Sequence, residues 1–481
     1  MADGGEYIPV PEMKRFVVDC FMAVGVSRTQ SETMSDCIVG ADSIGHNSHG
    51  VFRLSKFVTD VQNGNIDTHS SPKIEKETAA TAWVNGQNSL GPIVGNYCIK
   101  LAIAKAKKVG AAIVVANNSN NFGVAGHYTM QALQEGLIGL AFSNSSSLML
   151  PTRAKYPITG TNPISVAAPG IYDDFFLLDM ATTVTSRGNI KIKHKNCEFL
   201  PDGWAANAAC LPETNGDIAI NTGRFLPLGS SEESGSYKGT GLSIMVDILC
   251  GVLAAAAYSD MVGAWLNNYI KRRANIGHCF IVIDPNFFAP DFEVRMNDFL
   301  SSIRYAEPHD PNKSVRVAGD KARKIQEVIS EHGGLWYPDY VIEDLTKLSD
   351  SFKIKNVFCV PKPEPIRLTS SEEFAAFKEA EMRASGSIMH DEFSIISQRS
   401  SVVAIDNEEQ KTVSFSIEDS SEWLCPISDE EQPNTEDSIE KKKRDTLSKK
   451  EKLSGFQRFS TPHREEIPML LRLDEIMQTR Y

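Results

Sequence analysis

The chain has 481 residues, of which 42% are hydrophobic and 23% charged, with a formal net charge of -12. This length exceeds what one simple core holds, and the composition is that of a globular protein. The negative charge argues against a nucleic-acid or an anionic-membrane partner. The most apolar run, ILCGVLAAAA at 248–257, is about half of the ~20 residues of a membrane span. We interpret it as a buried helix that could lie at a subunit contact.

Cysteine and histidine spacing gives neither a disulfide nor a metal pattern. The nine cysteines include no CxxC pair, and the ten histidines no HExxH motif or ligand-spaced cluster. We therefore expect a reducing, cytoplasmic environment and no metal. The first residues lack a charged segment followed by an apolar one, so no secretory signal is expected.

The first fifty residues predict two helices. Pro11 suits a first helical turn, Gly25 closes the first helix, and Ser27 with Gln30 three residues later is typical of a capping box. The second helix leads into the polar segment DSIGHNSHGVFRL at 42–54.

From about residue 78, strand and helix patterns alternate. The expected elements are a strand in TAATAWVNG, a helix in LGPIVGNYCIKLAIAKAKKVG that ends at Gly110, a strand in AAIVVAN, the polar loop NNSNNFG, a helix in GHYTMQALQEG, and strands in LIGLAFSN and FFLLDMATT. This alternation predicts a mixed α/β domain.

Composition changes near residue 350. From there on the chain is rich in Ser, Glu, Asp and Lys, with the acidic stretch SDEEQPNTEDSIE followed by the basic KKKRDTLSKKEK. Charge blocks with sparse apolar periodicity are typical of disorder. We therefore predict a core over 1–350 and a charged, mostly disordered extension over 351–481.

The polar segment at 42–54 contains an acid/base candidate. Helical spacing would place Arg53 one turn beyond His49. A guanidinium can hold the carboxylate of an α-keto or α-hydroxy acid in two parallel hydrogen bonds, while a histidine exchanges a proton with the neighbouring oxygen. The alternative is a helix-end histidine beside a surface arginine, which for such a cluster alone is the more frequent arrangement.

No familiar cofactor loop accompanies this pair. The sequence has neither GxGxxG after a strand nor GxxxxGK[ST]. Lys238 between glycines could meet a phosphate, and Asp179 at a strand end could accept ribose hydroxyls. The glycine-rich stretches at 123–126, 158–163 and 235–242 could equally be turns. The residues alone lead to an α/β protein with an acid/base candidate.

Seven ordered motifs point further. They are SHGVFRL (48–54), NNSNNFGVAGHY (117–128), GLIGLAFSNSSSLMLPTRAKYPITGTNPISVAAPG (136–170), FLLDMATTVTSRGNI (176–190), YKGTGLSIMVDILCGVL (237–253), NIGHCFIVIDPNFF (275–288) and VRVAGDKARK (315–324). Over about residues 5–350 the chain resembles the malate/L-lactate dehydrogenase family that also contains ureidoglycolate dehydrogenase, sulfolactate dehydrogenase and diketogulonate reductase. This family is unrelated to the Rossmann-fold lactate and malate dehydrogenases.

The resemblance implies a homodimeric, NAD- or NADP-dependent oxidoreductase that interconverts a small 2-hydroxy acid and 2-oxo acid, malate/oxaloacetate-like or lactate-like. It implies a mixed α/β, non-Rossmann fold with a largely antiparallel central sheet flanked by helices. The 1–350 core would comprise an N-terminal helical part with the SHG motif at 1–70, cofactor-binding and helical parts at 71–300, and C-terminal helices at 301–350 that return to the N-terminal part.

Carried over residue by residue, the resemblance implies His49 as the acid/base residue and Arg53 as the carboxylate-binding arginine. The implied substrate contacts are Ser48, Arg53, Thr161 and Asn162. The implied cofactor contacts are Ser145, Asp179, Met180, Ala181, Lys238, Ala318, Gly319 and Asp320.

Four positions depart from the family pattern. Asn121 stands where the loop NSNHFG has a histidine, Asn189 replaces the lysine of RGK, and Ser147 and Ala318 each replace a proline. The first departure matters most, because asparagine forms hydrogen bonds but cannot exchange a proton near neutral pH. It leaves open a second hypothesis, a catalytically weak family descendant that acts as a binding or scaffold protein through its C-terminal tail.

Overall fold

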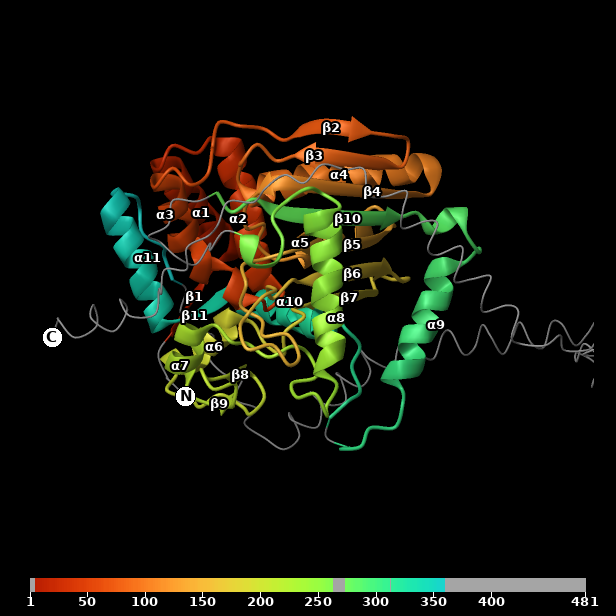
Figure 1. Ribbon diagram of the computed structural model, residues 1–481. Helices are drawn as coiled ribbons and strands as arrows, with labels where there is room; N and C mark the ends of the chain where they lie inside the picture. The colour runs from red at the N-terminus through yellow and green to blue at the C-terminus, as the bar shows by residue number, and fades with distance from the viewer. Residues whose placement is uncertain (1–4, 263–272, 312, 360–481) are drawn as a thin grey trace, which may run out of the picture. The chain divides into compact units, whose positions relative to one another are not determined.

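A computed structural model describes residues 5–262, 273–311 and 313–359 (Figure 1). These residues all fall within one unit, Met1–Arg367. Most of the extension predicted over 351–481 lies outside the described residues. The fold is mixed α/β, with a central, mostly antiparallel sheet flanked by helices, so the predicted fold class is confirmed.

Within the described residues the central sheet has seven strands, which Figure 1 shows stacked from the top of the view downward. In spatial order they are β2 (Lys73–Glu77), β3 (Thr81–Asn85), β4 (Ala111–Ser119), β10 (Ile276–Ile283), β5 (Ile138–Ser143), β6 (Ile164–Pro169) and β7 (Phe175–Met180). β3 and β4 run parallel and are joined by the helix α4 (Gly91–Val109), whereas the other neighbouring pairs are antiparallel.

The predicted strands are present as β3, β4, β5 and β7, and two predicted helices as α4 and α5 (Gly126–Leu133). α4 ends at the expected place, because Gly110 adopts a left-handed φ of 89° and its N–H bonds to the Ala106 carbonyl. β4 continues to Ser119, so the polar loop is shorter than the NNSNNFG segment predicted.

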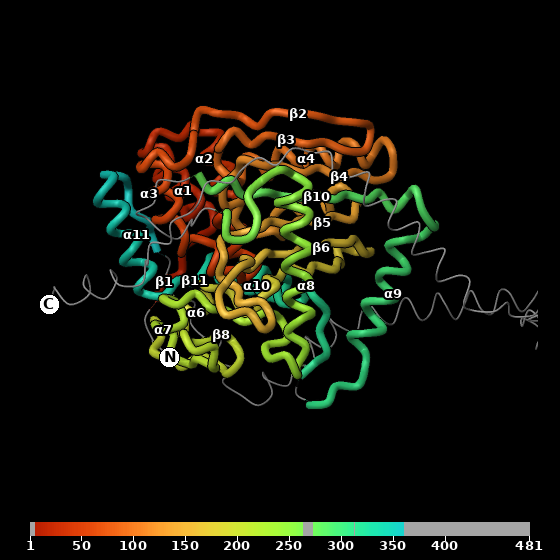
Figure 2. Tube along the Cα trace, in the orientation of Figure 1, coloured from red at the N-terminus to blue at the C-terminus, as the bar shows by residue number. Residues whose placement is uncertain are grey.

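Side-chain alternation along the strands divides the core of the sheet into two layers. Val114 and Phe280 pack with α4 and α5 on one face. Val115 and Cys279 pack on the other face, against α8 (Ser236–Asp247) and the residues that follow it. Successive side chains of a strand point to opposite faces, so strands that are hydrophobic throughout need helices on both sides. Figure 2 shows α8 crossing in front of the strands.

In the single chain, the apolar run at 248–257 is buried on one side only, and not as a regular α-helix. α8 continues into one π-helical turn, Ile248–Val252, in which Cys250 is buried. Ile248, Val252 and Leu253 are each more than half exposed. A helix that lies on one face of a sheet buries only one side, and hydropathy alone does not reveal this. None of the helices in the described part of the chain combines the length and apolar character of a membrane span.

The N-terminal helices form a second core with the C-terminal end of the described chain. Its helices are α1 (Val10–Ala23), α2 (Arg28–Ser43), α3 (Leu54–Gln62) and α11 (Asp339–Phe352). The two predicted N-terminal helices are confirmed, and Ser27 Oγ accepts a hydrogen bond from the Gln30 amide at 3.4 Å. The strand β1 (Gly5–Ile8) pairs antiparallel with β11 (Leu335–Pro338) beside this core.

The remaining elements lie around these two cores. They are α6 (Arg187–Lys195), β8 (Ala205–Ala206), β9 (Pro212–Glu213), α7 (Gly216–Thr222), α9 (Phe292–Arg304), α10 (Asp320–His332) and the short turns Ser259–Met261 and Pro285–Phe287.

The start of the predicted extension, residues 351–359, packs on the N-terminal helices. Ile354 and Val357 contact the apolar core of α1 and α11. Arg15 of α1 donates a hydrogen bond to the Lys355 carbonyl at 3.2 Å. The folded unit therefore continues beyond residue 350.

Candidate active site

Segments that are far apart in the sequence meet around a cavity of about 550 Å³, a volume typical of small-molecule and cofactor sites. Its wall comprises the SHG segment, the loop after β4, the ends of β5 and β7, and the approach to α10. The structure brings ten of the predicted site residues into this wall: Ser48, His49, Asn121, Ser145, Thr161, Asp179, Met180, Ala181, Ala318 and Gly319.

The SHG segment does not form the single helical turn that its spacing predicted. It forms two 3-10 turns, Asn47–His49 and Val51–Arg53, on either side of Gly50. A Cβ atom on Gly50 would lie 1.9 Å from Asp42 Oδ1, so a larger residue would collide with a buried carboxylate. The backbone break at glycine therefore sets the directions of the two functional side chains.

Two serines and an arginine surround His49. His49 Nδ1 lies 3.0 Å from Ser48 Oγ, which accepts a hydrogen bond from Ser186 Oγ at 3.3 Å. Arg53 Nε donates to the Ser48 carbonyl at 2.8 Å. Burial, with a smaller contribution from the positive charge of Arg53, lowers the pKa of His49 to about 3. The imidazole is therefore neutral near pH 7 and able to accept a proton.

Asn121 lies in the cavity wall at the position of the family histidine. Its Oδ1 accepts a hydrogen bond from the Gly123 amide at 2.9 Å. The neighbouring Phe122 ring stacks on His278 with a centroid distance of 4.5 Å and an interplanar angle of 5°. Both ring nitrogens of His278 lie within hydrogen-bond distance of serine hydroxyls, at 2.8 and 2.9 Å. The loop that carries Asn121 is thus fixed from the sheet side.

Asp179, Ala318 and Gly319 also lie in the wall of the cavity. Asp179 Oδ2 accepts the Gly126 amide at 2.6 Å, and burial raises the pKa of the Asp179 carboxyl. Gly319 has a left-handed φ of 110°, and the preceding Ala318 carbonyl accepts the Leu177 amide at 3.0 Å. A ligand can approach the backbone closely where glycine provides no side chain.

Four predicted site residues are described by the structure but do not line this cavity. Arg53 lies behind Ser48, and Lys238 is exposed on α8. Asn162 is fully buried, and its Oδ1 accepts the Ser145 amide at 3.0 Å. Asp320 forms ion pairs with one arginine of α9 and one of α10. Asn162 and Asp320 thus hold neighbouring backbone in place.

Sequence reasoning assigned no role to three residues near the site. Ser186 contacts Ser48, Arg187 follows it on α6, and Asp42 lies beneath the SHG segment. Asp42 Oδ2 accepts both the Val51 amide and the Tyr337 hydroxyl, each at 2.9 Å. Burial raises the pKa of Asp42 to about 7. All three residues occur inside quoted motifs, but serine and aspartate there equally suit helix ends and turns.

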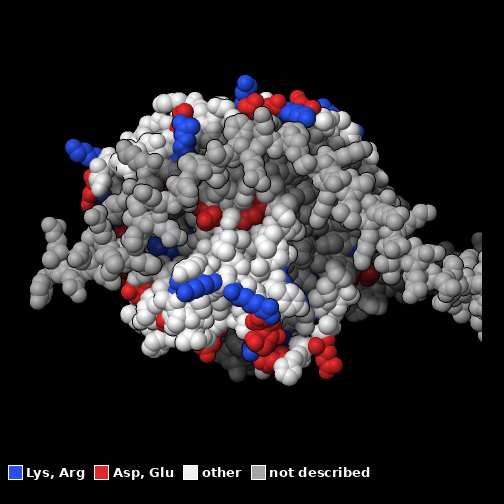
Figure 3. Space-filling view, in the orientation of Figure 1, with Lys and Arg blue, Asp and Glu red and all other residues white. Residues whose placement is uncertain are grey.

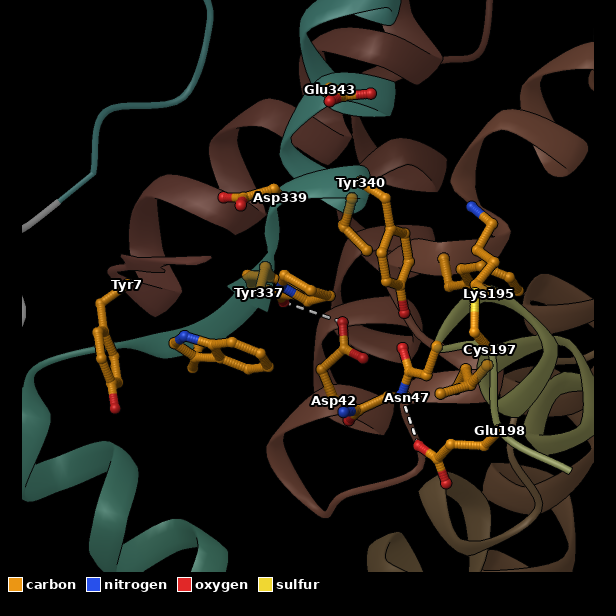
Figure 4. Close-up of a pocket in the computed structure, with 16 residues that line it drawn as sticks. Tyr7, Asp42, Asn47, Lys195, Cys197, Glu198, Tyr337, Asp339, Tyr340 and Glu343 are labelled. Atoms are coloured by element: carbon orange, nitrogen blue, oxygen red, sulfur yellow. Dashed lines mark hydrogen bonds between the residues drawn. The ribbon is translucent and has the colours of Figure 1, made fainter. Parts of the chain in front are cut away.

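Asp42 also lines a second cavity, of about 1160 Å³. Figure 4 shows the Asp42 carboxylate below Tyr337, with Tyr340 and Lys195 at the far side of this space. The Lys195 ammonium lies 4.3 Å from the centre of the Tyr340 ring. Within the described residues, no group of three His, Cys, Asp or Glu side chains could hold a metal ion.

A neutral histidine and a carboxylate in the wall of one cavity, with an arginine next to the histidine segment, are the groups that acid/base chemistry on a small organic acid needs. The family model described as malate/L-lactate dehydrogenase matches residues 8–346. The chain belongs to this family, so the resemblance noted in the sequence is confirmed.

Three relatives illustrate the range of the family. The malate dehydrogenase of Pyrococcus horikoshii is 36% identical over 350 residues, which cover 71% of this chain and 95% of that protein. A solved structure of that enzyme matches with a TM-score of 0.68 at 32% identity, covering 74% of this chain and 97% of the other. The L-sulfolactate dehydrogenase of Methanocaldococcus jannaschii is 33% identical over 61% of this chain and 83% of its own. The ureidoglycolate dehydrogenase (NAD(+)) of Escherichia coli O157:H7 is 29% identical over 55% of this chain and 73% of its own.

Proposed function

We propose that this protein is an NAD- or NADP-dependent oxidoreductase that interconverts a small 2-hydroxy acid and the corresponding 2-oxo acid. One observation carries the proposal: His49, which is neutral near pH 7, lies in the cavity wall, and Arg53 is held behind it by a hydrogen bond to the Ser48 carbonyl. The relatives, which are malate, sulfolactate and ureidoglycolate dehydrogenases by name, support the same class of reaction.

His49 is the proton donor and acceptor in this proposal. When a 2-hydroxy acid is oxidised, neutral His49 takes the hydroxyl proton as the hydride leaves the same carbon. In the reverse direction, imidazolium returns the proton to the carbonyl oxygen. The bound carboxylate favours the imidazolium form, because an opposite charge nearby raises a histidine pKa. When bound, the nicotinamide supplies or accepts the hydride, so the 2-oxo acid gains one hydride and one proton in total.

Arg53 holds the substrate carboxylate. Burial and the nearby charge of Arg187 lower its pKa to about 10, which leaves the guanidinium protonated near pH 7. Its Nε donates to the Ser48 carbonyl at 2.8 Å, and this hydrogen bond holds the guanidinium next to the SHG segment. Ser48 keeps the imidazole of His49 in place through Nδ1.

The cofactor site of this proposal is the part of the cavity wall formed by the ends of β5 and β7 and by the approach to α10. Its contacts are Ser145, Asp179, Met180, Ala181, Ala318 and Gly319. A left-handed glycine and a half-buried carboxylate suit a ligand that lies against the main chain and offers hydroxyl groups. Asp320 supports the loop before α10, since Val317 N donates to its Oδ2 at 2.8 Å. Lys238 does not line this cavity in the described structure. Its role as a cofactor contact rests on the family motif alone.

Asn121 has a positioning role in this proposal. Its oxygen accepts the Gly123 amide, and its amide nitrogen, which has no hydrogen bond to another described residue, can orient a substrate oxygen. Proton transfer is left to His49, so the histidine of the family loop is dispensable here.

The test is a panel of 2-oxo acids with NADH and with NADPH, followed by the absorbance of the reduced nicotinamide. We expect turnover with at least one short 2-oxo acid. Tight cofactor binding without turnover on any acid would instead support the scaffold hypothesis, which depends on residues 351–481.

Two further properties belong to the same proposal: a homodimer and a cytoplasmic location. The exposed apolar face of α8 and its π-helical turn, which includes Ile244, Ile248 and Val252, supports a second copy of the chain as the partner. Figure 3 shows uncharged residues over much of this region. Light-scattering mass of the purified protein, and of an Ile248→Glu variant, tests the dimer.

A further inference from the structure

The SHG segment separates the candidate active site from the second cavity, of about 1160 Å³. His46, Ser48 and His49 line the first cavity, whereas Asn47 and Phe52 line the second. The helix α6 divides in the same way, because residues of its first turn line the first cavity and residues near its end line the second. The two cavities thus share a wall, and a molecule bound in the second would contact the back of the acid/base segment.

Aromatic rings form much of the wall of the second cavity. They are Tyr7 of β1, Phe52 of the SHG segment, Trp336 and Tyr337 of β11, and Tyr340 of α11. The Lys195 ammonium lies 4.3 Å from the centre of the Tyr340 ring and 5.5 Å from that of Phe52 (Figure 4). Aromatic faces attract cations at such distances. A lysine of the chain itself therefore shows where the cavity accommodates a cation.

Carboxyl groups outnumber this one ammonium group in the wall. Four acidic residues line the cavity: Asp42, Glu198, Asp339 and Glu343. Glu198 pairs with Lys193 at 2.5 Å, but within the described residues no basic side chain forms an ion pair with the other three. Asp42 is buried, and although its Oδ2 accepts two hydrogen bonds, no described residue donates to its Oδ1. Aromatic faces with surplus carboxylates have the chemistry that recognises an organic cation.

We propose that the second cavity binds an organic cation with an aromatic or apolar body, and that the bound cation strengthens binding of the substrate acid in the first cavity. The charged group of this ligand takes the position of the Lys195 ammonium near Tyr340. Its apolar part lies against the other rings, and Asp339 and Glu343 supply the opposite charge. The inference goes beyond the proposed function, because it assigns a second ligand and a second site.

The shared wall provides the coupling between the two sites. Asp42 Oδ2 accepts the Val51 amide, and Asn47 begins the 3-10 turn that carries His49. A ligand in the second cavity restrains Asp42 and Asn47, so less order has to be gained when the substrate acid binds on the other side. A cation behind the segment also favours an anion in front of it. Each ligand then strengthens the binding of the other by the same factor.

The probes are benzylamine, which is a cation near neutral pH, and benzyl alcohol, its neutral counterpart of similar size. Isothermal titration calorimetry measures their binding to the full-length protein without any organic acid present. The variants are Tyr340→Leu, Tyr340→Phe, Lys195→Met and the double variant Asp339→Asn/Glu343→Gln. Asp344→Asn is the matched control, because Asp344 lies on α11 but does not line this cavity.

We expect benzylamine to bind with a dissociation constant of about 1 mM, and benzyl alcohol at least about tenfold more weakly. Tyr340→Leu and the double variant should each weaken benzylamine binding by about tenfold, whereas Tyr340→Phe and Asp344→Asn should change it less than about twofold. Lys195→Met should strengthen benzylamine binding by roughly 3- to 10-fold, because the competing ammonium group is removed. Damaged folding would not produce such a gain.

The coupling is measured on the initial rate of 2-hydroxy acid oxidation, since benzylamine forms imines with 2-oxo acids. Benzylamine at about 1 mM should lower the KM of the hydroxy acid by about threefold, which corresponds to a coupling factor of about five. Tyr340→Leu should keep the basal KM, and the same concentration of benzylamine should change that KM less than about 1.5-fold.

Equal affinity for benzylamine and benzyl alcohol, or wild-type benzylamine binding in both Tyr340→Leu and the double variant, would overturn the cation site. Unchanged or weaker binding in Lys195→Met would contradict the position given to the charge. Displacement of benzylamine by NADH or by malate would assign it to the first cavity, and a constant KM would remove the coupling. The calorimetry requires no turnover, so failure of the proposed function is distinguishable from failure of the second site.

Discussion

The Tyr337 hydroxyl and the Val51 amide donate hydrogen bonds to one oxygen, Asp42 Oδ2, each at 2.9 Å. A single buried carboxylate oxygen thus connects β11 to the segment that carries His49 and Arg53. We expect the position of this acceptor oxygen, rather than the charge of the carboxylate, to hold the two 3-10 turns in place.

The first prediction concerns the charge of Asp42. Burial raises its pKa to about 7, so between pH ~4 and pH ~7 the folded state holds a proton that the unfolded state has lost. The contribution of this group to stability is therefore full at low pH and is lost as the pH rises toward 7. Asp42→Asn keeps an acceptor oxygen but does not titrate, so this pH dependence is absent from the variant. Its free energy of unfolding should exceed that of the wild type by about 1–3 kcal/mol at pH 8, and the gain should shrink toward pH 5.

Urea denaturation at both pH values measures this difference. Asp42→Ala is the contrasting variant, because it leaves the Val51 amide and the Tyr337 hydroxyl unpaired, at about 1–3 kcal/mol for each group. It should be less stable than the wild type and turn over more slowly. Equal behaviour of the alanine and asparagine variants would show that the two hydrogen bonds do not support the segment.

The second prediction concerns proton transfer. His49→Ala should lower turnover by about 10²–10⁴-fold, because general acid/base catalysis contributes that much, and leave cofactor affinity nearly unchanged. His127, on α5, does not line the cavity and provides a matched control as His127→Gln. A His49→Ala protein with wild-type turnover would remove this residue from the mechanism.

The third prediction concerns the substrate carboxylate. Arg53→Lys keeps the charge but not the planar fork, so we expect KM for the 2-oxo acid to rise about tenfold or more while kcat changes less. The Nε hydrogen bond to the Ser48 carbonyl is lost as well. If KM stayed constant and only kcat fell, Arg53 would act through the geometry of Ser48 and His49 rather than on the substrate.

The fourth prediction concerns Asn121. Because His49 carries the proton, Asn121→His should change turnover less than about tenfold in either direction. The comparison is 2-oxo acid reduction by the wild type and the variant at matched thermal stability. A silent wild type that the histidine activates by orders of magnitude would identify this loop as the site of the obligatory base.

The fifth prediction separates the folded unit from the extension. Truncation after residue 359 should leave melting temperature and activity unchanged, since the contacts of Ile354 and Val357 are retained. Truncation after residue 350 removes these contacts and the hydrogen bond from Arg15 to Lys355, and should lower the melting temperature by several degrees. If truncation after residue 359 abolished activity without changing the melting temperature, the residues beyond 359 would take part in the reaction.

The sequence predicts an element correctly where residues within that element determine its structure. α4 was predicted to its last residue, because apolar periodicity and a left-handed glycine are both readable in one segment. The two 3-10 turns of the SHG segment could not be predicted in this way. They depend on the Asp42 carboxylate, which packs against Gly50 and accepts a hydrogen bond from Tyr337, 295 residues further along the chain. Motif order pointed to His49 and Asp179. The sequence gives no sign of Arg187, since what distinguishes it is a buried Nε without a hydrogen-bond partner among the described residues, which only the three-dimensional structure reveals.

The pairing of β1 with β11 has a consequence for synthesis. Gly5–Ile8 is synthesised before the other described elements and finds its partner, Leu335–Pro338, only after nearly all of them have left the ribosome. Until then the apolar faces of α1 and α2 lack α11, and such surfaces in a nascent chain invite chaperones and aggregation. Because Tyr337 belongs to that late strand, the support beneath His49 is assembled last. Nascent chains released before residue 338 should therefore bind a chaperone and show no activity, however complete their central sheet.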